Sequence, residues 1–156
     1  SFDADFKEAY SVGRRDPAIP FFAGFIRENT PKILRVFPEA RYRVCELSCT
    51  AEQKELLREK MNACYEKRFR YHYCIIGLPF IWMQKPFYQK NHYTCSSFLA
   101  RVMDEVELTL FDKHFSMVTP KDFYELEQLQ VLYEGYLSDY FVSRHLFYGK
   151  GELYGT

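Results

Sequence analysis

Apolar side chains recur at helical spacing over residues 51–67, with polar residues filling the positions between them. Just before this segment, Thr50 and Gln53 have the spacing of a capping box, in which each side chain bonds the other residue's backbone N–H. The segment is therefore predicted to be a helix. Its apolar face is formed by Leu57, Met61 and Cys64.

A second helix is predicted to begin at Cys95 and to end near Glu105. Counted from the cysteine, apolar residues fall at i+3, i+4 and i+7, which is one face of a helix. These residues are Phe98, Leu99 and Val102. Thr94 is a suitable N-cap, because its side-chain oxygen can accept a hydrogen bond from a backbone N–H that has no partner inside the helix. Cys95 is thus expected in the first helical turn.

Shorter apolar stretches have the composition of strands and are bounded by turn residues. They occupy residues 9–12, 21–26, 41–47 and 130–134. Glycine and proline predict a loop at 13–17 that continues to Pro20. A third helix is predicted to start at 119–122, where a proline occupies the first helical position. The order of these elements indicates a single α+β domain.

Composition narrows the setting of this domain. The chain has 156 residues, of which 47% are hydrophobic, so it can bury a core of ordinary size. Lys and Arg number 21, as do Asp and Glu, so no global basic field exists to attract nucleic acid or anionic lipid. No apolar run approaches the roughly 18 residues that span a bilayer. We therefore expect neither a nucleic-acid partner nor a membrane span.

The first residues, 1–5, have neither the basic start nor the apolar core of a signal peptide. Because no initiator Met is present, the chain is expected to be processed or to be part of a longer protein. The five cysteines form an odd set without a C-x-x-C pair, which indicates free thiols in a reducing compartment. A cytoplasmic location is the corresponding expectation.

Four residues of types that bind metals lie in the first half of the chain. They are Cys45, Cys49, His72 and Cys74. Their spacing matches no common zinc pattern, and a closed site would need all four to converge. We therefore expect no metal and no cofactor.

Cys95 is the candidate for chemistry. The unpaired N–H groups and the helix dipole at a helix start favour a thiolate, which is the nucleophilic form. The alternative is a small buried packing residue at the start of a helix. A nucleophile also needs a base, usually a histidine, and a third group that orients this base.

The chain offers four histidines as candidate bases. His92 lies three residues before Cys95 and could fold back toward it, or could simply be solvated. His72 lies between two tyrosines and is expected to be packed in the core. Nothing in their context supports His114 or His145. No histidine lies on a predicted strand, where a rigid base would normally be mounted.

The order of these segments resembles a known family. Residues 93–100, Tyr-Thr-Cys-Ser-Ser-Phe-Leu-Ala, are similar to the nucleophile helix of the NlpC-like papain-fold cysteine peptidases, in their circularly permuted branch. The strand at 42–47 leads into a long helix, as in that branch. Residues 118–124 and 132–135 resemble its Thr-Pro helix start and its final strand. The resemblance covers roughly residues 1–140.

The resemblance implies an antiparallel sheet packed against helices, with residues 141–156 as a tail. It implies that Cys95 attacks a carbonyl of a small peptide, acyl or amide substrate and forms an acyl-enzyme. The catalytic histidine would precede the cysteine on the first core strand, a few residues ahead of Ser1, so that the domain would lack its first strand here. Glu46 and Ser11 are polar strand residues that could be the third member, although each is better explained as an exposed strand residue.

The same sequence is also consistent with two other functions. The domain could be a catalytically inactive binding module of papain-like fold, in which Cys95 is a structural relic, or it could be a thiol acyltransferase. For an enzyme, we expect Tyr10, Tyr93 or Trp82 to form walls of the substrate pocket.

Overall fold

The computed structural model describes residues 9–16, 19–28, 39–140 and 142, with side chains from residue 39 onward. The elements of these ranges, in chain order, are β1 (Ala9–Asp16), β2 (Ile19–Glu28), β3 (Arg41–Leu47), α2 (Ala51–Glu66), η1 (Arg68–Arg70), β4 (His72–Tyr73), α3 (Gly77–Trp82), β5 (His92–Tyr93), α4 (Cys95–Asp104), η2 (Phe115–Met117), α5 (Pro120–Tyr124) and β6 (Leu129–Tyr136). The mixture of helices and strands confirms the α+β prediction at this level.

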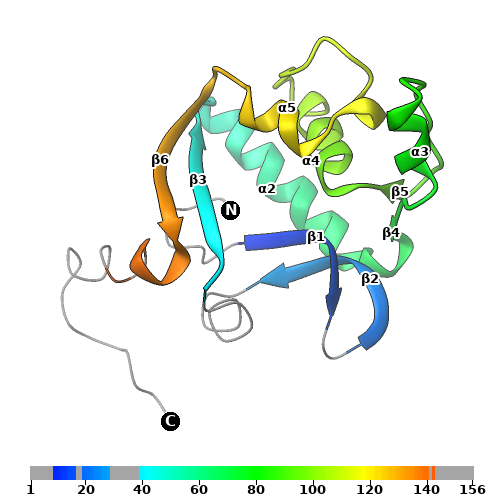
Figure 1. The fold of residues 1–156 in the computed structure, drawn as a ribbon, viewed down its shortest axis with the longest axis horizontal. Coiled ribbons are helices and arrows are strands. Elements are labelled where there is room, and N and C mark those ends of the chain that lie inside the picture. Colours follow the sequence, from blue (N-terminus) through cyan, green and yellow to red (C-terminus); the bar gives the residue numbers. More distant parts are fainter. Residues whose placement is uncertain (1–8, 17–18, 29–38, 141, 143–156) are drawn as a thin grey trace.

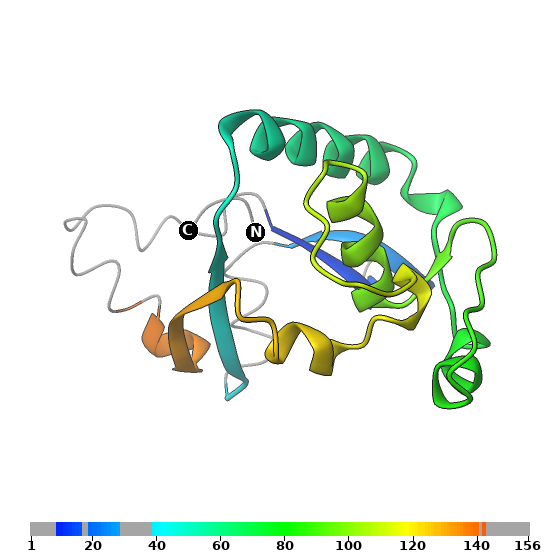
Figure 2. The same ribbon diagram turned by 90° about the horizontal axis from the view of Figure 1, so that it is seen from above.

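Helices α2 and α4 form the middle of the molecule, between β3 and β6 at one end and α3 at the other (Figures 1 and 2). The β1–β2 hairpin packs against this middle part, because β1 contacts α4 and β2 contacts α2. Within the described ranges, no helix is both long enough and apolar enough to span a membrane.

The described strands form three separate pairs. β1 with β2 and β3 with β6 are antiparallel, as expected, whereas the very short β4 and β5 are parallel. A parallel pair needs a crossover connection, and here the connection contains α3. The β1–β2 hairpin reaches the β4–β5 pair through contacts of both its strands with β4.

The predicted loop at 13–17 is wrong for its first four residues, which continue β1 to Asp16. The register shifts between Val12 and Arg14, so Gly13 is an extra residue in β1. A glycine inside a strand commonly marks such a bulge rather than an end of the strand. Pro20, also expected in the loop, lies in β2.

The main core lies between α2 and α4 and confirms both predicted helices. Its buried residues are Met61, Tyr93, Phe98 and Val102, with Leu57, Cys64, Tyr65, Tyr71 and Phe115 packed around them. Burying a side chain such as Phe98, which is 2% exposed, stabilises the fold by about 1.5–3 kcal/mol. The prediction of Leu99 on the same buried face is wrong, because this side chain is 37% exposed and points elsewhere.

A second cluster holds the β3–β6 pair. Leu137 and Tyr140 are buried against Tyr42, Val44 and Tyr133. Since Tyr42 and Val44 alternate with Arg43 along β3, this cluster occupies one face of the pair and leaves Arg43 for the other.

Charged groups link the two central helices at their surface. Glu105 accepts hydrogen bonds of 2.9 Å from Lys60 of α2 and from Arg101 of α4. Burial of the Glu105 carboxyl opposes its ionisation, but the bonds from Lys60 and Arg101 outweigh burial and lower its pKa. Arg101 also donates to the hydroxyls of Tyr88 and Tyr93, which ties α4 to the segment that precedes it.

Candidate active site

Cys95 is the first residue of α4, as predicted, and it is half-buried. Thr94 caps the helix: its Oγ1 accepts from the N–H of Ser97 at 3.2 Å, and its own N–H donates to Ser97 Oγ at 2.9 Å. Ser97 thus replaces the usual Glu or Gln of a capping box. The buried cap fixes the backbone immediately ahead of the cysteine.

The next residue, Ser96, ties the start of α4 to the segment that enters α5. Its Oγ donates a hydrogen bond of 2.6 Å to the backbone carbonyl of Val118. Both residues are buried, Ser96 at 4% and Val118 at 0% exposure. The carbonyl has no access to water, so this bond satisfies a group that would otherwise be costly to bury. It also sets the distance between Cys95 and α5.

A pocket of about 250 Å³ lies between these elements. Helix α4 contributes Cys95, Ser96 and Leu99; β3 contributes Arg43 and Cys45; α5 contributes Pro120, Phe123 and Tyr124; and Leu129 begins β6. Most of the wall is apolar, and Arg43 is its charged residue. The pocket therefore suits a ligand with an apolar portion that lies beside the thiol of Cys95.

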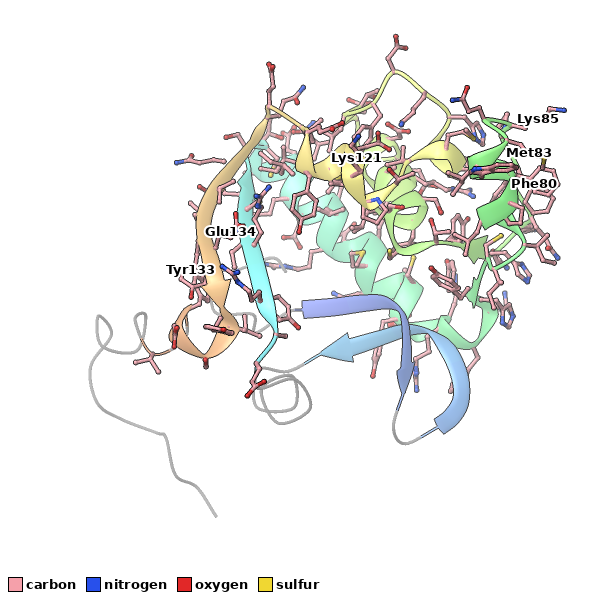
Figure 3. The ribbon with its side chains drawn as sticks, in the orientation of Figure 1. Phe80, Met83, Lys85, Lys121, Tyr133 and Glu134 are labelled. Carbon is pink, nitrogen blue, oxygen red and sulfur yellow. The ribbon has the colours of Figure 1, made fainter. Side chains whose placement is uncertain are left out.

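The guanidinium of Arg43 is held in place at the pocket. It bonds Glu134 of β6 through Nε at 2.8 Å and through Nη2 at 2.7 Å, and its Cζ lies 4.5 Å from the ring centre of Tyr124. Glu134 is labelled in Figure 3 where β3 and β6 lie side by side. The cation is therefore largely neutralised, and it positions Tyr124 as a wall of the pocket.

A bulge in the β3–β6 pair lies beside the second thiol of the pocket. Val44 pairs with Tyr133, but Cys45 pairs with Val131, so Leu132 is an extra residue in β6. Bulges redirect side chains and are frequent beside active sites. Cys45 follows Arg43 on the same face of β3, and both line the pocket.

The α5 wall is fixed by its own N-terminus, which confirms the predicted helix start. Asp122 accepts from the N–H of Thr119 at 2.7 Å and from its hydroxyl at 2.8 Å, and its other oxygen pairs with Lys113 at 2.7 Å. Burial alone would raise the pKa of the Asp122 carboxyl. Its bonds to Lys113 and Thr119 have the larger effect, so the pKa is lowered. The carboxylate thus stays ionised at the end of the helix where the dipole favours it.

None of the described histidines lines the pocket. His92 Nδ1 bonds the carbonyl of Lys90 at 2.9 Å, and its ring lies 5.0 Å from that of His72. The prediction of a core position for His72 is wrong, because it is exposed. Although no histidine lies on a strand that the sequence predicts, His72 and His92 lie on β4 and β5 and pair across them. His145 lies outside the described residues.

The last described histidine, His114, has a local structural role. Its Nδ1 accepts from the N–H of Ser116 at 3.3 Å and lies 2.7 Å from Ser116 Oγ, at the start of η2. This contact orders the segment that follows α4.

Of the three residues expected to form walls of the pocket, the structure describes the side chains of Tyr93 and Trp82, and neither lines the pocket. Tyr93 is buried in the main core, where its hydroxyl meets Arg101, and Trp82 is 86% exposed on α3. The side chains of Tyr10 and Ser11 lie outside the described residues. Glu46 is exposed on β3 and pairs with Gln130.

Sequence reasoning missed Tyr73 as a neighbour of the site. Burial raises the pKa of this phenol, and repulsion between the ionised phenol and the thiolate forms of Cys95 and Cys74 adds to the rise. Tyr73 is therefore a neutral hydroxyl within electrostatic range of the cysteine. It lies on β4, a strand of two residues that no hydrophobic pattern could have indicated.

The other cysteines differ from Cys95 in their surroundings. Cys64 lies in the core face of α2, where burial raises its pKa, and its Sγ contacts the hydroxyl of Tyr71 at 3.4 Å. Cys49 is exposed and Cys74 is buried. Among the described residues, no three His, Cys, Asp or Glu side chains lie close enough to hold a metal ion.

The chain was compared with protein-family models, with curated proteins and with solved structures, and none of the three comparisons found a match.

Proposed function

We propose that this chain is most of a papain-like cysteine hydrolase domain, a peptidase or amidase of the circularly permuted NlpC-like kind, with Cys95 as its nucleophile. The observation that carries the proposal is the position of Cys95. Its thiol is on the first residue of a capped helix and also lines an apolar pocket. A cysteine that served only to pack a helix start would have no need of a pocket beside it.

The proposed reaction has two steps. The thiolate of Cys95 attacks the carbonyl carbon of an amide, and the tetrahedral intermediate expels the amine, which takes a proton from the base as it leaves. Water then attacks the resulting thioester, giving a carboxylic acid and returning the thiol. An acyl acceptor other than water would make the same enzyme an acyltransferase.

Backbone groups at the start of α4 suit the charge that develops on the carbonyl oxygen. The first intrahelical bond runs from the N–H of Phe98 to the carbonyl of Thr94. The amides of Cys95 and Ser96 precede it, and such amides have no acceptor within a helix. Under the proposal, they are the donors that stabilise the oxyanion.

The base is the histidine that the family resemblance places on the strand ahead of Ser1. β1, the first described strand, contacts the nucleophile helix α4. We accordingly propose no base among His72, His92 and His114, since none lines the pocket that holds Cys95.

An acyl-enzyme would test the proposal directly. The chain is incubated with p-nitrophenyl acetate, an activated ester whose leaving group needs no proton, and the modified peptide is identified by mass spectrometry. We expect an acetyl thioester on Cys95 and its release by hydroxylamine. Cys95→Ala should abolish this thioester, whereas the matched variant Cys45→Ala, in the same pocket, should retain it.

Two results would contradict the proposal. Acetylation spread equally over Cys45 and Cys49 would show that Cys95 has no special reactivity. Binding of apolar amides in the pocket, without acylation of Cys95, would instead indicate the noncatalytic binding module.

A further inference from the structure

The equal numbers of acidic and basic residues conceal a segregation of charge along the chain. Between residues 67 and 103 there is no Asp or Glu. The same stretch holds six basic residues, which are Lys67, Arg68, Arg70, Lys85, Lys90 and Arg101. It includes η1, β4, α3, β5 and most of α4, so this segment is cationic although the net charge is zero. Arg101, in α4, is paired with Glu105, which leaves five cations in η1, α3 and the segments beside them.

Helix α3, within this stretch, is apolar on its outer side. Leu78 and Trp82 lie on α3, four residues apart and therefore on one side of the helix, while Ile75 and Ile76 precede the helix and Met83 follows it. All five are exposed, with Trp82 at 86% and Ile75 at 69%. Large apolar side chains that are exposed along one short segment are typical of an interaction surface.

The inner side of α3 is packed, so its exposed side chains, Leu78 and Trp82, face solvent. Gly77 is buried so close to Cys74 that a Cβ would lie 3.0 Å from its sulfur. Phe80 stacks on Phe87 with ring centres 4.5 Å apart. Because Gly77 and Phe80 occupy the inner side, the helix cannot turn Leu78 and Trp82 into the core.

The position of α3 makes this surface prominent. It lies at one end of the molecule, opposite β3 and β6, in both views (Figures 1 and 2). Phe80, Met83 and Lys85 are labelled together at this end, far from Tyr133 and Glu134 (Figure 3).

Exposed cations lie in the same segment of the chain as these apolar residues. Lys85 follows α3 and Lys90 follows shortly after it, while Lys67 and Arg70 lie at η1. Among the described residues, no carboxylate forms an ion pair with any of these four side chains. Within the described part of the chain, therefore, no carboxylate neutralises their charge, which suits an anionic partner.

We propose that this surface, Ile75, Ile76, Leu78, Trp82 and Met83 with Lys85 and Lys90, binds the face of an anionic lipid bilayer. A tryptophan with aliphatic neighbours enters the boundary between headgroups and acyl chains, and lysines beside it meet the lipid phosphates. A fluid bilayer adapts to a projecting apolar surface, whereas a protein partner would need a surface of complementary shape. The helix lies in the interface and does not cross it.

The single tryptophan of the chain makes this proposal directly measurable. Trp82 fluorescence and co-sedimentation are recorded with vesicles of phosphatidylcholine alone and of phosphatidylcholine mixed with phosphatidylglycerol. We expect a blue shift and co-sedimentation with the anionic vesicles only, both lost at high salt because the phosphate contacts are screened.

Variants separate the two parts of the surface. Lys85→Gln with Lys90→Gln should lower the partition coefficient by about fivefold per cation removed. Ile76→Ser with Met83→Ser should abolish the blue shift. The matched variant Lys54→Gln with Lys121→Gln, at exposed positions of α2 and α5, should bind like the original chain. All these positions are exposed, so circular dichroism should show the same fold for each variant.

An unchanged spectrum and no sedimentation with anionic vesicles would overturn the proposal. So would a blue shift that appears without lipid as the protein concentration rises, because it would assign the surface to a second copy of the chain. Equal binding by the Lys85 and Lys90 double variant would contradict the role of the cations.

Discussion

Ser96 and Val118, which are 22 residues apart in the chain, are joined by a hydrogen bond of 2.6 Å from the serine hydroxyl to the backbone carbonyl. Ser96 follows Cys95 directly, and Val118 stands just before the cap of α5. One side chain thus connects the residue next to the candidate nucleophile with the opposite wall of its pocket.

Removing this bond should weaken both stability and the site. In Ser96→Ala, the buried carbonyl of Val118 loses its partner, and we expect the free energy of unfolding to fall by about 1–3 kcal/mol. Urea denaturation measures this loss. Ser48→Ala, at an exposed position, should change stability by less than about 0.5 kcal/mol. Equal stability of the two variants would show that the Ser96 bond contributes nothing.

The cap of α4 should matter for reactivity as well as for stability. Thr94→Ala removes the side chain that orders the first turn, at a cost of about 1 kcal/mol. We expect slower alkylation of Cys95, because the amides ahead of Ser97 lose their fixed orientation. The rate is measured with iodoacetamide and mass spectrometry.

A second capping box in the chain provides the control. Thr50 and Gln53 form the same reciprocal pair at the start of α2, away from the pocket. Thr50→Ala should cost similar stability and leave the alkylation rate of Cys95 unchanged. A matching loss of rate in both variants would mean that the effect reflects stability alone.

Filling the pocket should discriminate between large and small reagents. Leu99 lines the pocket and is 37% exposed, so Leu99→Trp can be accommodated without disturbing the core. Acylation by a long-chain p-nitrophenyl ester should slow by roughly tenfold or more, since apolar contacts in the pocket are lost. Alkylation by iodoacetamide should change little. Leu56→Trp, at an exposed position of α2, should affect neither reagent, and a loss of both reactions with Leu99→Trp would indicate a general distortion.

Acid should weaken the link between α2 and α4. The pKa of Glu105 is lowered because the bonds from Lys60 and Arg101 outweigh burial. A carboxyl with a lowered folded-state pKa contributes stability above its unfolded value, about 4.3, and the contribution is lost as the pH falls through the folded value. Urea midpoints should therefore drop more between pH 6 and pH 3.5 in the original chain than in Glu105→Gln. Since Glu105 is largely exposed, the difference should be small, and an identical drop in the two proteins would contradict it.

The sequence predicts helix starts well, because each start depends on residues that are close together in the chain. The starts of α2, α4 and α5 are predictable because Thr50, Thr94 and Thr119 each form a capping box with a residue three positions on. A capping box joins two residues three positions apart, so both partners can be recognised from the sequence alone.

What the sequence could not predict depends on pairing between distant segments. Arg43, Tyr124 and Leu129 meet Cys95 only because β3 pairs with β6 and α5 packs on α4. The β4–β5 pair has two residues in each strand, too few for a period to be visible. Gly13 predicts the end of a strand although it lies inside one, because a bulge and a turn have the same local composition.

The rate at which Cys95 reacts with iodoacetamide at pH 6 shows whether its thiol is activated. At this pH an ordinary thiol, whose pKa is about 8.5, is almost entirely protonated, and the thiolate is the form that reacts. If Cys95 is an activated nucleophile, it is alkylated first, ahead of the more exposed Cys49 and of its pocket neighbour Cys45. If Cys95 reacts no faster than these two cysteines, its thiol is not activated, and the proposed hydrolase function is contradicted.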